Sequence, residues 1–242
     1  MAATRGGKTG KPINLYFWPT PNGWKVSIML EECRLPYNVI PVNIAAGEQF
    51  KPEFLKISPN NRMPAIVDPD GPGGRPISVF ESGAILQYLG RKTGKFYPVG
   101  ERARVSVDEW LFWQMANLGP KAGEASHFRR YAPEKISYAL DRFGNEMDRL
   151  MGVMNRRLRD RRYLAGSYSI ADMACVGWIR LQERQGETFK AFPHLKRWLN
   201  VVRARPAVQR GMNIRVEAAS RVDVSDPKVR AVLFGQGAKK AR

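Results

Sequence analysis

The stretch Asn14-Leu-Tyr-Phe-Trp-Pro-Thr-Pro-Asn-Gly-Trp-Lys25 combines a strand, a turn and the beginning of a helix. Its aromatic start is typical of a strand, its Pro/Gly centre of a turn, and the apolar positions after Lys25 of a helix. A helix that begins at such a turn presents unpaired backbone N–H groups, which suit an anion or a reactive thiolate. The turn contains Thr20 and Asn22 but no cysteine, so any thiolate held there must come from elsewhere.

The composition is that of a folded, strongly basic protein. The chain has 242 residues, of which 43% are hydrophobic, and a formal net charge of +18. This length fits one large or two modest domains with a substantial core. The apolar runs are shorter than the roughly 18 residues of a membrane span, and the N-terminus lacks the apolar centre of a secretory signal. We therefore expect a cytoplasmic protein without a membrane partner.

The positive charge is compatible with nucleic acid, a membrane surface or an acidic small ligand. Neither zinc-finger nor helix-turn-helix spacing accompanies it, so nucleic-acid binding is the weaker interpretation. Cys33 and Cys175 lie far apart and form no metal-type spacing, and His127 and His194 are equally separated. We predict buried thiols and no metal site.

Hydrophobic periodicity divides the chain into two domains of different class. The first, 13–95, has the order β-α-β-α-β-β-α, which is the thioredoxin-like arrangement of an α/β domain. In it, strands are expected at 13–18, 35–43, 63–68 and 77–80, helices at 23–34 and 81–94, and a short helix or turn at 51–57. The prolines of the second strand favour an edge position.

Beyond Pro98 only helical patterns follow, so 101–215 is predicted to be an all-helical domain. Its helices are expected at 101–118, 136–158, from 169 onward and at 194–204. Ser169-Ile-Ala-Asp172 is typical of a capping box, which is a structural pattern. The remaining segments are predicted to be a disordered basic N-terminus, 1–12, and a basic C-terminal tail, 216–242.

Chemistry is concentrated at the ends of the elements in the first domain. The first such place is the turn with Thr20 and Asn22, for which helix capping is the simpler role. The second is the segment Arg62-Met-Pro-Ala65, in which a proline at the entry to a strand favours a cis bond after Met63. The backbone of Met63 could then pair with an extended peptide.

Glu81-Ser82 lies at a helix N-terminus, where Ser82 and backbone N–H groups can bind a carboxylate and Glu81 can accept from an ammonium group. A carboxylate beside an ammonium is one end of an amino acid. An extended peptide with a thiol fits the other two features, and glutathione supplies all of these groups.

Four motifs resemble the glutathione transferases: Thr20-Pro-Asn22, Ser58-Pro-Asn-Asn-Arg-Met-Pro-Ala-Ile66, Phe80-Glu-Ser-Gly-Ala-Ile85 and Ser169-Ile-Ala-Asp172. The local details are similar to the bacterial nu class of glutathione-dependent disulfide-bond reductases and to the globular domain of the yeast nitrogen-regulatory prion protein. The resemblance covers roughly residues 13–210. It implies the glutathione transferase fold, with a thioredoxin-like N-terminal domain and a C-terminal helical bundle.

The resemblance also implies roles for individual residues. Thr20 and Asn22 would contact the glutathione thiol, and Gln49 would contact the glycyl end. Met63, which precedes cis-Pro64, would pair with the peptide backbone, and Glu81 and Ser82 would bind the γ-glutamyl group. Arg142 would reach the site of a neighbouring subunit in a homodimer. Bound glutathione would supply the thiolate that attacks a disulfide or an electrophilic small molecule. A non-catalytic glutathione-binding or regulatory protein on the same fold stays open. Tyr16 falls inside a strand and is expected to pack.

Overall fold

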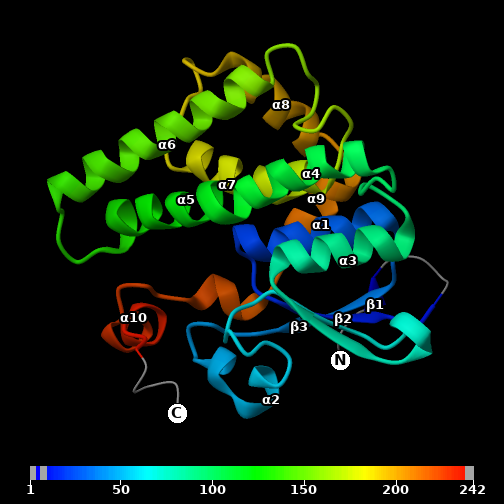
Figure 1. Cartoon of the computed structure of the whole chain (residues 1–242). Helices are drawn as coiled ribbons and strands as arrows, with labels where there is room; N and C mark the ends of the chain where they lie inside the picture. Colours follow the sequence, from blue (N-terminus) through cyan, green and yellow to red (C-terminus); the bar gives the residue numbers. More distant parts are fainter. Residues whose placement is uncertain (1–3, 6–9, 238–242) are drawn as a thin grey trace. The chain divides into compact units, whose positions relative to one another are not determined.

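The computed structural model describes residues 4–5 and 10–237, which form two compact units (Figure 1). The first unit contains the chain up to Leu86 together with the segment from Arg210 onward, and the second contains Gln87–Gln209. The C-terminal segment therefore belongs with the N-terminal unit. The sequence alone places this boundary near 215 and the earlier one between 95 and 101.

The first unit is built on a mixed sheet with the order β1-β3-β2-β4-β5 among the described residues. The central strand β2 pairs in parallel with β3 and antiparallel with β4, and β4 pairs antiparallel with β5. The strands are β1 (Thr4–Arg5), β2 (Ile13–Phe17), β3 (Tyr37–Pro41), β4 (Ala65–Asp68) and β5 (Ile77–Phe80). This arrangement confirms the thioredoxin-like fold.

The helices of this unit follow the predicted order. They are α1 (Pro21–Cys33), the 3-10 turn Glu48–Phe50, α2 (Pro52–Leu55), the 3-10 turn Pro72–Gly74 and α3 (Ser82–Thr93), which continues into the second unit. Ile13, Leu15 and Phe17 of β2 are buried in the alternating pattern of a strand. The β2 strand and α1 thus share one core, with the turn between them at its end.

The N-terminus contributes more than the sequence indicates. Thr4 and Arg5 pair with Asn38 and Tyr37, so β1 lies outside β3. The predicted edge position of the second strand is therefore wrong, since β3 has a short neighbour on its outer side. Residues 1–3 and 6–9 of the expected disordered N-terminus lie outside the described residues.

The second unit is helical, as the periodicity predicts. Its α6 packs against α5 and α8, and α7 packs against α4 and α8. The elements are α4 (Glu101–Trp113), a π-helical turn (Gln114–Leu118), α5 (Gly119–Ser126), a second π-helical turn (His127–Tyr131), α6 (Ser137–Arg157), α7 (Ile170–Arg184), α8 (Pro193–Arg203) and the start of α9 (Pro206–Met212). Within the described ranges, none of the helices is long and apolar enough to cross a bilayer.

The predicted capping box at the start of α7 is confirmed. The Ser169 hydroxyl accepts from the N–H of Ala171, and the Asp172 carboxylate accepts from the N–H of Ser169 at 3.1 Å. The indole of Trp198 also donates to Asp172, at 2.8 Å. Asp172 is completely buried, so the cap also joins α7 to α8.

The segment after Arg210 is anchored on α1 and then forms additional structure. Ser27 donates its hydroxyl to the carbonyl of Gly211 at 2.8 Å, and Arg210 pairs with Glu31 at 2.6 Å. The chain continues through a 3-10 segment (Glu217–Arg221) to α10 (Pro227–Phe234). The C-terminal tail expected from the sequence therefore contains a helix in its described part.

Candidate functional site

The turn between β2 and α1 places Thr20 at the N-cap of the helix. Its hydroxyl accepts from the backbone N–H of Gly23 at 3.3 Å and lies 3.6 Å from the sulfur of Met63, to which it donates. Asn22 follows within the first turn and is half-buried. The first turn of α1 contains no acidic residue, so its positive dipole end is not neutralised locally.

Gly23 is required by the close approach of the chain to itself in this turn. A Cβ atom at this position would lie 2.3 Å from the carbonyl oxygen of Trp18 and 3.0 Å from the Cε atom of Met63. Only glycine fits such a distance without movement of the backbone. The turn, the start of α1 and Met63 are therefore packed as one body.

The predicted cis peptide bond between Met63 and Pro64 is confirmed. Met63 is 8% exposed, and its sulfur faces the Thr20 hydroxyl. The bond lies directly before β4, whose Ala65 pairs with Tyr16 of β2. The structure thus brings together Thr20 and Met63, two predicted site residues that are 43 positions apart in the sequence.

Glu81 and Ser82 occupy the link between β5 and α3. Glu81 has a φ of +65°, a left-handed conformation that is uncommon for residues with a side chain and is found preferentially at binding sites. Ser82 is 6% exposed at the first position of α3. A carboxylate at this helix N-terminus would meet the Ser82 hydroxyl and the backbone N–H groups of the first turn.

Two side chains near this link are not identified as site residues by any pattern in the sequence. Lys25 of α1 is 2% exposed, and its ammonium group donates to the Ser82 hydroxyl at 3.3 Å. Asn60 donates its side-chain amide to Glu81 at 3.0 Å. Both contacts join segments that are far apart in the sequence, so only the folded chain identifies Lys25 and Asn60 as neighbours of the site.

Gln49 is buried in the turn before α2. Its amide nitrogen donates to the carbonyl of Ile44 at 3.1 Å, while its Oε1 atom is buried and has no hydrogen-bond partner in the described part of the chain. An unpartnered buried acceptor costs about 1–3 kcal/mol. Gln49 therefore keeps one acceptor that an N–H group of a ligand can satisfy.

Arg142 lies in the second unit, on α6. Its side chain is 54% exposed, and the guanidinium is 3.9 Å from Glu146. The hydrogen bond from Arg149 holds the pKa of Glu146 below its usual range, against the opposite effect of the burial of Glu146, and the charge of Arg149 adds to the lowering. Arg142 thus has a surface position, and its predicted role in the site of a second subunit stays a prediction.

The two cysteines and Tyr16, the other reactive side chains considered from the sequence, are packed against other side chains of the protein. Cys33 is the last residue of α1 and Cys175 lies in the middle of α7, and both are buried thiols. Tyr16 packs its ring against Phe54 at 5.9 Å, and burial raises the pKa of its hydroxyl. Among the described residues, no group of three or more His, Cys, Asp and Glu could hold a metal ion.

Comparison with known families agrees with this geometry. The family described as "Glutathione S-transferase, N-terminal domain" matches residues 11–91, and "Glutathione S-transferase, C-terminal domain" matches residues 130–206. The chain belongs to the glutathione S-transferase family. The matched ranges of this glutathione transferase contain every predicted site residue, from Thr20 to Arg142.

Two similar proteins within this family have a named activity. The chain is 49% identical to the disulfide-bond oxidoreductase YfcG of Escherichia coli over 81% of its own length and 92% of that protein. It is 39% identical to the disulfide-bond oxidoreductase YghU of the same organism, over 83% of this chain and 74% of the relative. Both relatives carry the same activity in their names.

Solved structures show the same fold with ligands. A glutathione transferase from Pseudomonas putida, with one glutathione disulfide bound per subunit, is 41% identical with a TM-score of 0.81, covering 87% of this chain and 94% of that one. A transferase from Burkholderia graminis, with two glutathione molecules bound per subunit, is 41% identical with a TM-score of 0.82, covering 85% and 89%.

Proposed function

We propose that this protein is a glutathione-dependent disulfide-bond reductase in which bound glutathione supplies the nucleophilic thiolate. The observation that carries the proposal is the N-terminus of α1, where the Thr20 hydroxyl occupies the N-cap and both cysteines lie elsewhere as buried thiols. A thiol that arrives with its ligand completes such a site. The named activity of the two Escherichia coli relatives supports the same reaction.

Glutathione would lie across the ends of α1, β4 and α3. Its γ-glutamyl carboxylate would bind at Ser82 and the first turn of α3, with Lys25 behind Ser82, while Glu81 accepts from the ammonium group. The backbone of Met63 would pair with the cysteinyl residue. The buried acceptor of Gln49 would receive an N–H group at the glycyl end.

The thiolate would be stabilised at the turn that opens α1. Lowering a thiol pKa from about 8.5 to about 7 requires on the order of 2 kcal/mol. A helix terminus contributes roughly 0.3–2 kcal/mol, and one hydrogen bond about 0.5–1.5 kcal/mol. The Thr20 hydroxyl, with Asn22 nearby, would leave Met63 and donate to the sulfur of the ligand, so the reaction needs no protein base.

The reaction then consists of two thiol–disulfide exchanges. In the first, the glutathione thiolate attacks one sulfur of the substrate disulfide, forming a mixed disulfide and releasing the other half as a thiolate, which takes a proton from solvent. In the second, another glutathione thiolate attacks the glutathionyl sulfur of the mixed disulfide and releases the remaining half. The substrate gains two electrons and two protons, and two glutathione molecules become one disulfide.

Two further features of the proposal concern assembly and location. The active form would be a homodimer in which Arg142 of α6 enters the site of the neighbouring subunit, and an exposed guanidinium is available for such a contact. The protein would act in the cytoplasm, since reduced cysteines and a glutathione substrate fit a reducing compartment. Small disulfides or electrophiles would be its second substrates.

The proposal is tested by the steady-state reduction of hydroxyethyl disulfide in the presence of glutathione, with the formation of glutathione disulfide as the readout. Turnover that saturates with both substrates is expected. Binding of glutathione disulfide without turnover of hydroxyethyl disulfide or of an electrophilic substrate would instead assign the protein to non-catalytic binding on the same fold.

A further inference from the structure

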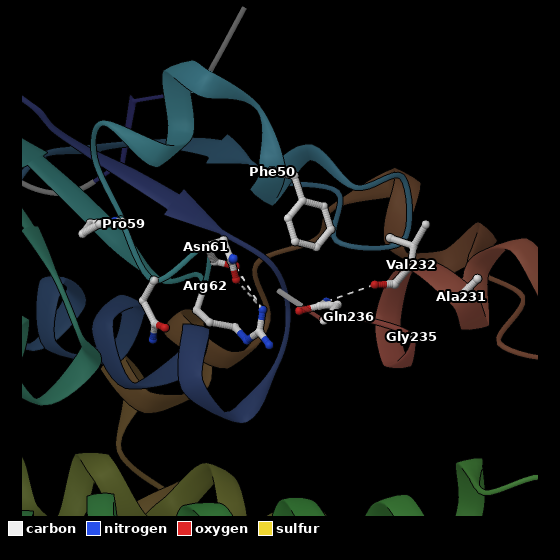
Figure 2. A pocket seen from close by; sticks show the side chains of 10 residues that line it. Phe50, Pro59, Asn61, Arg62, Ala231, Val232, Gly235 and Gln236 are labelled. Atoms are coloured by element: carbon white, nitrogen blue, oxygen red, sulfur yellow. Dashed lines mark hydrogen bonds between the residues drawn. The ribbon is translucent and has the colours of Figure 1, made fainter. Parts of the chain in front are cut away.

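A cavity of about 490 Å³ lies between the loop before Met63 and the C-terminal helix α10. Figure 2 shows Arg62 on one side of it and Val232 on the other, with Phe50 between the two. Arg62 is the residue directly before Met63 in the sequence. This cavity therefore adjoins the proposed glutathione contacts and is counted with them.

A second cavity, of about 340 Å³, lies in the helical unit and is called the α6 cavity below. It is bordered by α6, by the end of α7 and by the link that follows α7, and its volume falls within the range of small-molecule sites. The buried side chains of Met147 and Met151 give it an apolar floor. All of its described lining residues belong to the second unit, and none of them is a proposed glutathione contact.

Two carboxylates of α6 line this cavity without a cation beside them. Asp141 and Asp148 are exposed, and neither forms an ion pair in the part of the chain that the structure describes. The arginines of the same helix, Arg142 and Arg149, pair with Glu146 instead. In a protein with a net charge of +18, this local excess of negative charge favours a cationic ligand over an anionic one.

The spacing of the two carboxylates suits a ligand with two separate cationic groups. Asp141 and Asp148 are seven positions apart, which places them on one face of α6, two turns or roughly 10 Å apart along its axis. Gly144 lies between them and lines the cavity. A Cβ atom at Gly144 would meet nothing within 4 Å, so the face is open between the two acids.

A buried amide gives the independent indication of a ligand. Gln182 of α7 is 2% exposed and lines the cavity, and its Nε2 atom is buried without a hydrogen-bond partner in the described ranges. A buried donor is unfavourable unless an acceptor reaches it. Arg129, also in the lining, is exposed and has no acidic partner among the described residues. The cavity thus offers donors for an anionic group besides its two carboxylates.

We propose that the α6 cavity binds a free diamino acid of the lysine class. Its two ammonium groups pair with Asp141 and Asp148. Its carboxylate accepts from the Gln182 amide and pairs with the guanidinium of Arg129, which matches a carboxylate in geometry. The methylene chain lies on the methionine floor. The site is separate from the proposed reaction and does not rest on it.

Simpler ligands satisfy only part of this arrangement. A diamine would pair with the two aspartates but would leave the Gln182 donor and Arg129 without an acceptor. A simple carboxylate would meet Arg129 but would lie near three acids, since Glu187 also lines the cavity and is held in place by accepting from the N–H of Phe189 at 2.7 Å. Only a ligand with two cationic groups and one anionic group complements all of these side chains.

The test is a calorimetric titration of the full chain with L-lysine, with cadaverine, which lacks the carboxylate, and with 6-aminohexanoate, which lacks the α-ammonium group. We expect L-lysine to saturate one site per chain. Each analogue should bind at least about tenfold more weakly, because it loses a charged hydrogen bond. Absence of saturable lysine binding, or equal affinity for lysine and either analogue, would overturn the proposal.

Side-chain variants separate the two ends of the ligand. Gln182→Leu and Arg129→Gln should each weaken lysine roughly tenfold without weakening cadaverine, a difference that a general loss of folding would not produce. Asp148→Asn should weaken both ligands. Asp160→Asn, which removes an exposed carboxylate outside the lining, should weaken neither. Unchanged lysine affinity in Gln182→Leu or in Asp148→Asn would contradict the assigned contacts.

Two glycines of α6 provide a matched test of the cavity itself. Gly144→Met fills the open space between the aspartates and should abolish lysine binding, whereas Gly152→Met, on the same helix but outside the lining, should retain it. Lysine binding that survives in Gly144→Met would place the ligand elsewhere. These titrations contain no glutathione and no disulfide, so their failure would leave the proposed reduction of disulfides untouched, and failure of that reaction would leave lysine binding untouched.

Discussion

The ammonium group of Lys25 lies 3.3 Å from the hydroxyl of Ser82, with both side chains buried. This contact joins the beginning of α1 to the beginning of α3. Lys25 thus brings a positive charge to the contact between the two helices, of which α1 is proposed to hold a thiolate at its N-terminus and α3 a carboxylate. A buried lysine is rare unless it has partners, and an anionic ligand bound at Ser82 would add one.

Substitution of Lys25 by Met tests this arrangement. Met approximates the length of the lysine side chain but removes its charge and its hydrogen bond to Ser82. We expect the Kd of glutathione to rise by about ten- to a hundredfold, since a hydrogen bond to a charged group contributes roughly 1.5–3 kcal/mol. Titration calorimetry gives the measurement. Lys56→Met, at an exposed position, is the control, and equal Kd values for all three proteins would contradict the assignment.

Thr20 is expected to stabilise the thiolate. Thr20→Ala removes the hydroxyl, which costs about 1 kcal/mol of helix capping and one hydrogen bond to the ligand sulfur, so turnover should fall roughly tenfold and the pKa of bound glutathione should rise. Thr20→Ser keeps the hydroxyl and should keep most of the activity. The pH dependence of turnover reports the thiol pKa. An unchanged pKa in Thr20→Ala would exclude Thr20 from thiolate stabilisation.

The cysteines of the protein are expected to be dispensable. Cys33→Ser and Cys175→Ser should retain the hydroxyethyl disulfide turnover of the parent protein, because the nucleophile belongs to glutathione and both thiols are buried, Cys33 at the last residue of α1 and Cys175 in α7. The kcat of each folded variant is the measurement. A Cys33→Ser protein that folds but has lost turnover would require a protein thiol in the reaction.

Two glycines provide opposite predictions for stability. Gly23→Ala places a Cβ atom 2.3 Å from the backbone oxygen of Trp18 and should lower the free energy of unfolding by about 1–3 kcal/mol, with loss of glutathione binding as the turn moves. Gly144→Ala, in α6 with open space around it, should raise that free energy by about 0.5–1 kcal/mol. Urea denaturation measures both. Equal stability of the two variants would contradict the packing described for the turn.

Asp172 predicts a pH dependence of stability. Burial raises the pKa of its carboxyl from 3.8 to about 6, although Trp198 and backbone N–H groups of Leu164 and Ser169 stabilise the charged form. The folded state therefore binds the proton more tightly than the unfolded state. The contribution of Asp172 to stability is greatest below pH 3.8 and declines as the pH rises toward about 6, by about 3 kcal/mol in total.

The measurement is the free energy of unfolding of the parent protein and of Asp172→Asn between pH 4 and pH 7. The difference between them, parent minus variant, should decrease with rising pH across this range and become constant above it. Asp148→Asn, which removes an exposed carboxylate from α6, should lack this decrease. Parallel stability curves for the parent and Asp172→Asn would show that the carboxyl titrates identically in both states.

Much of the framework could be predicted from sequence because it is encoded locally. The alternation in β2, the turn at Thr20 and the capping box at Ser169 each depend on neighbouring residues, and the structure contains all of them. The cis bond before Pro64 is local in the same sense. The helix in the C-terminal segment was missed, since 216–242 has a basic composition that is also typical of unstructured ends.

The sequence by itself determined which elements form, in which order, and which of their ends carry polar groups, because these properties follow from backbone preferences over a few residues. Only the tertiary structure decided that Lys25 supports Ser82, that Asn60 supports Glu81, and that α10 returns to complete a cavity beside Arg62. Such contacts depend on how the sheet and its helices pack, and packing brings together residues whose separation along the chain carries no periodic signal.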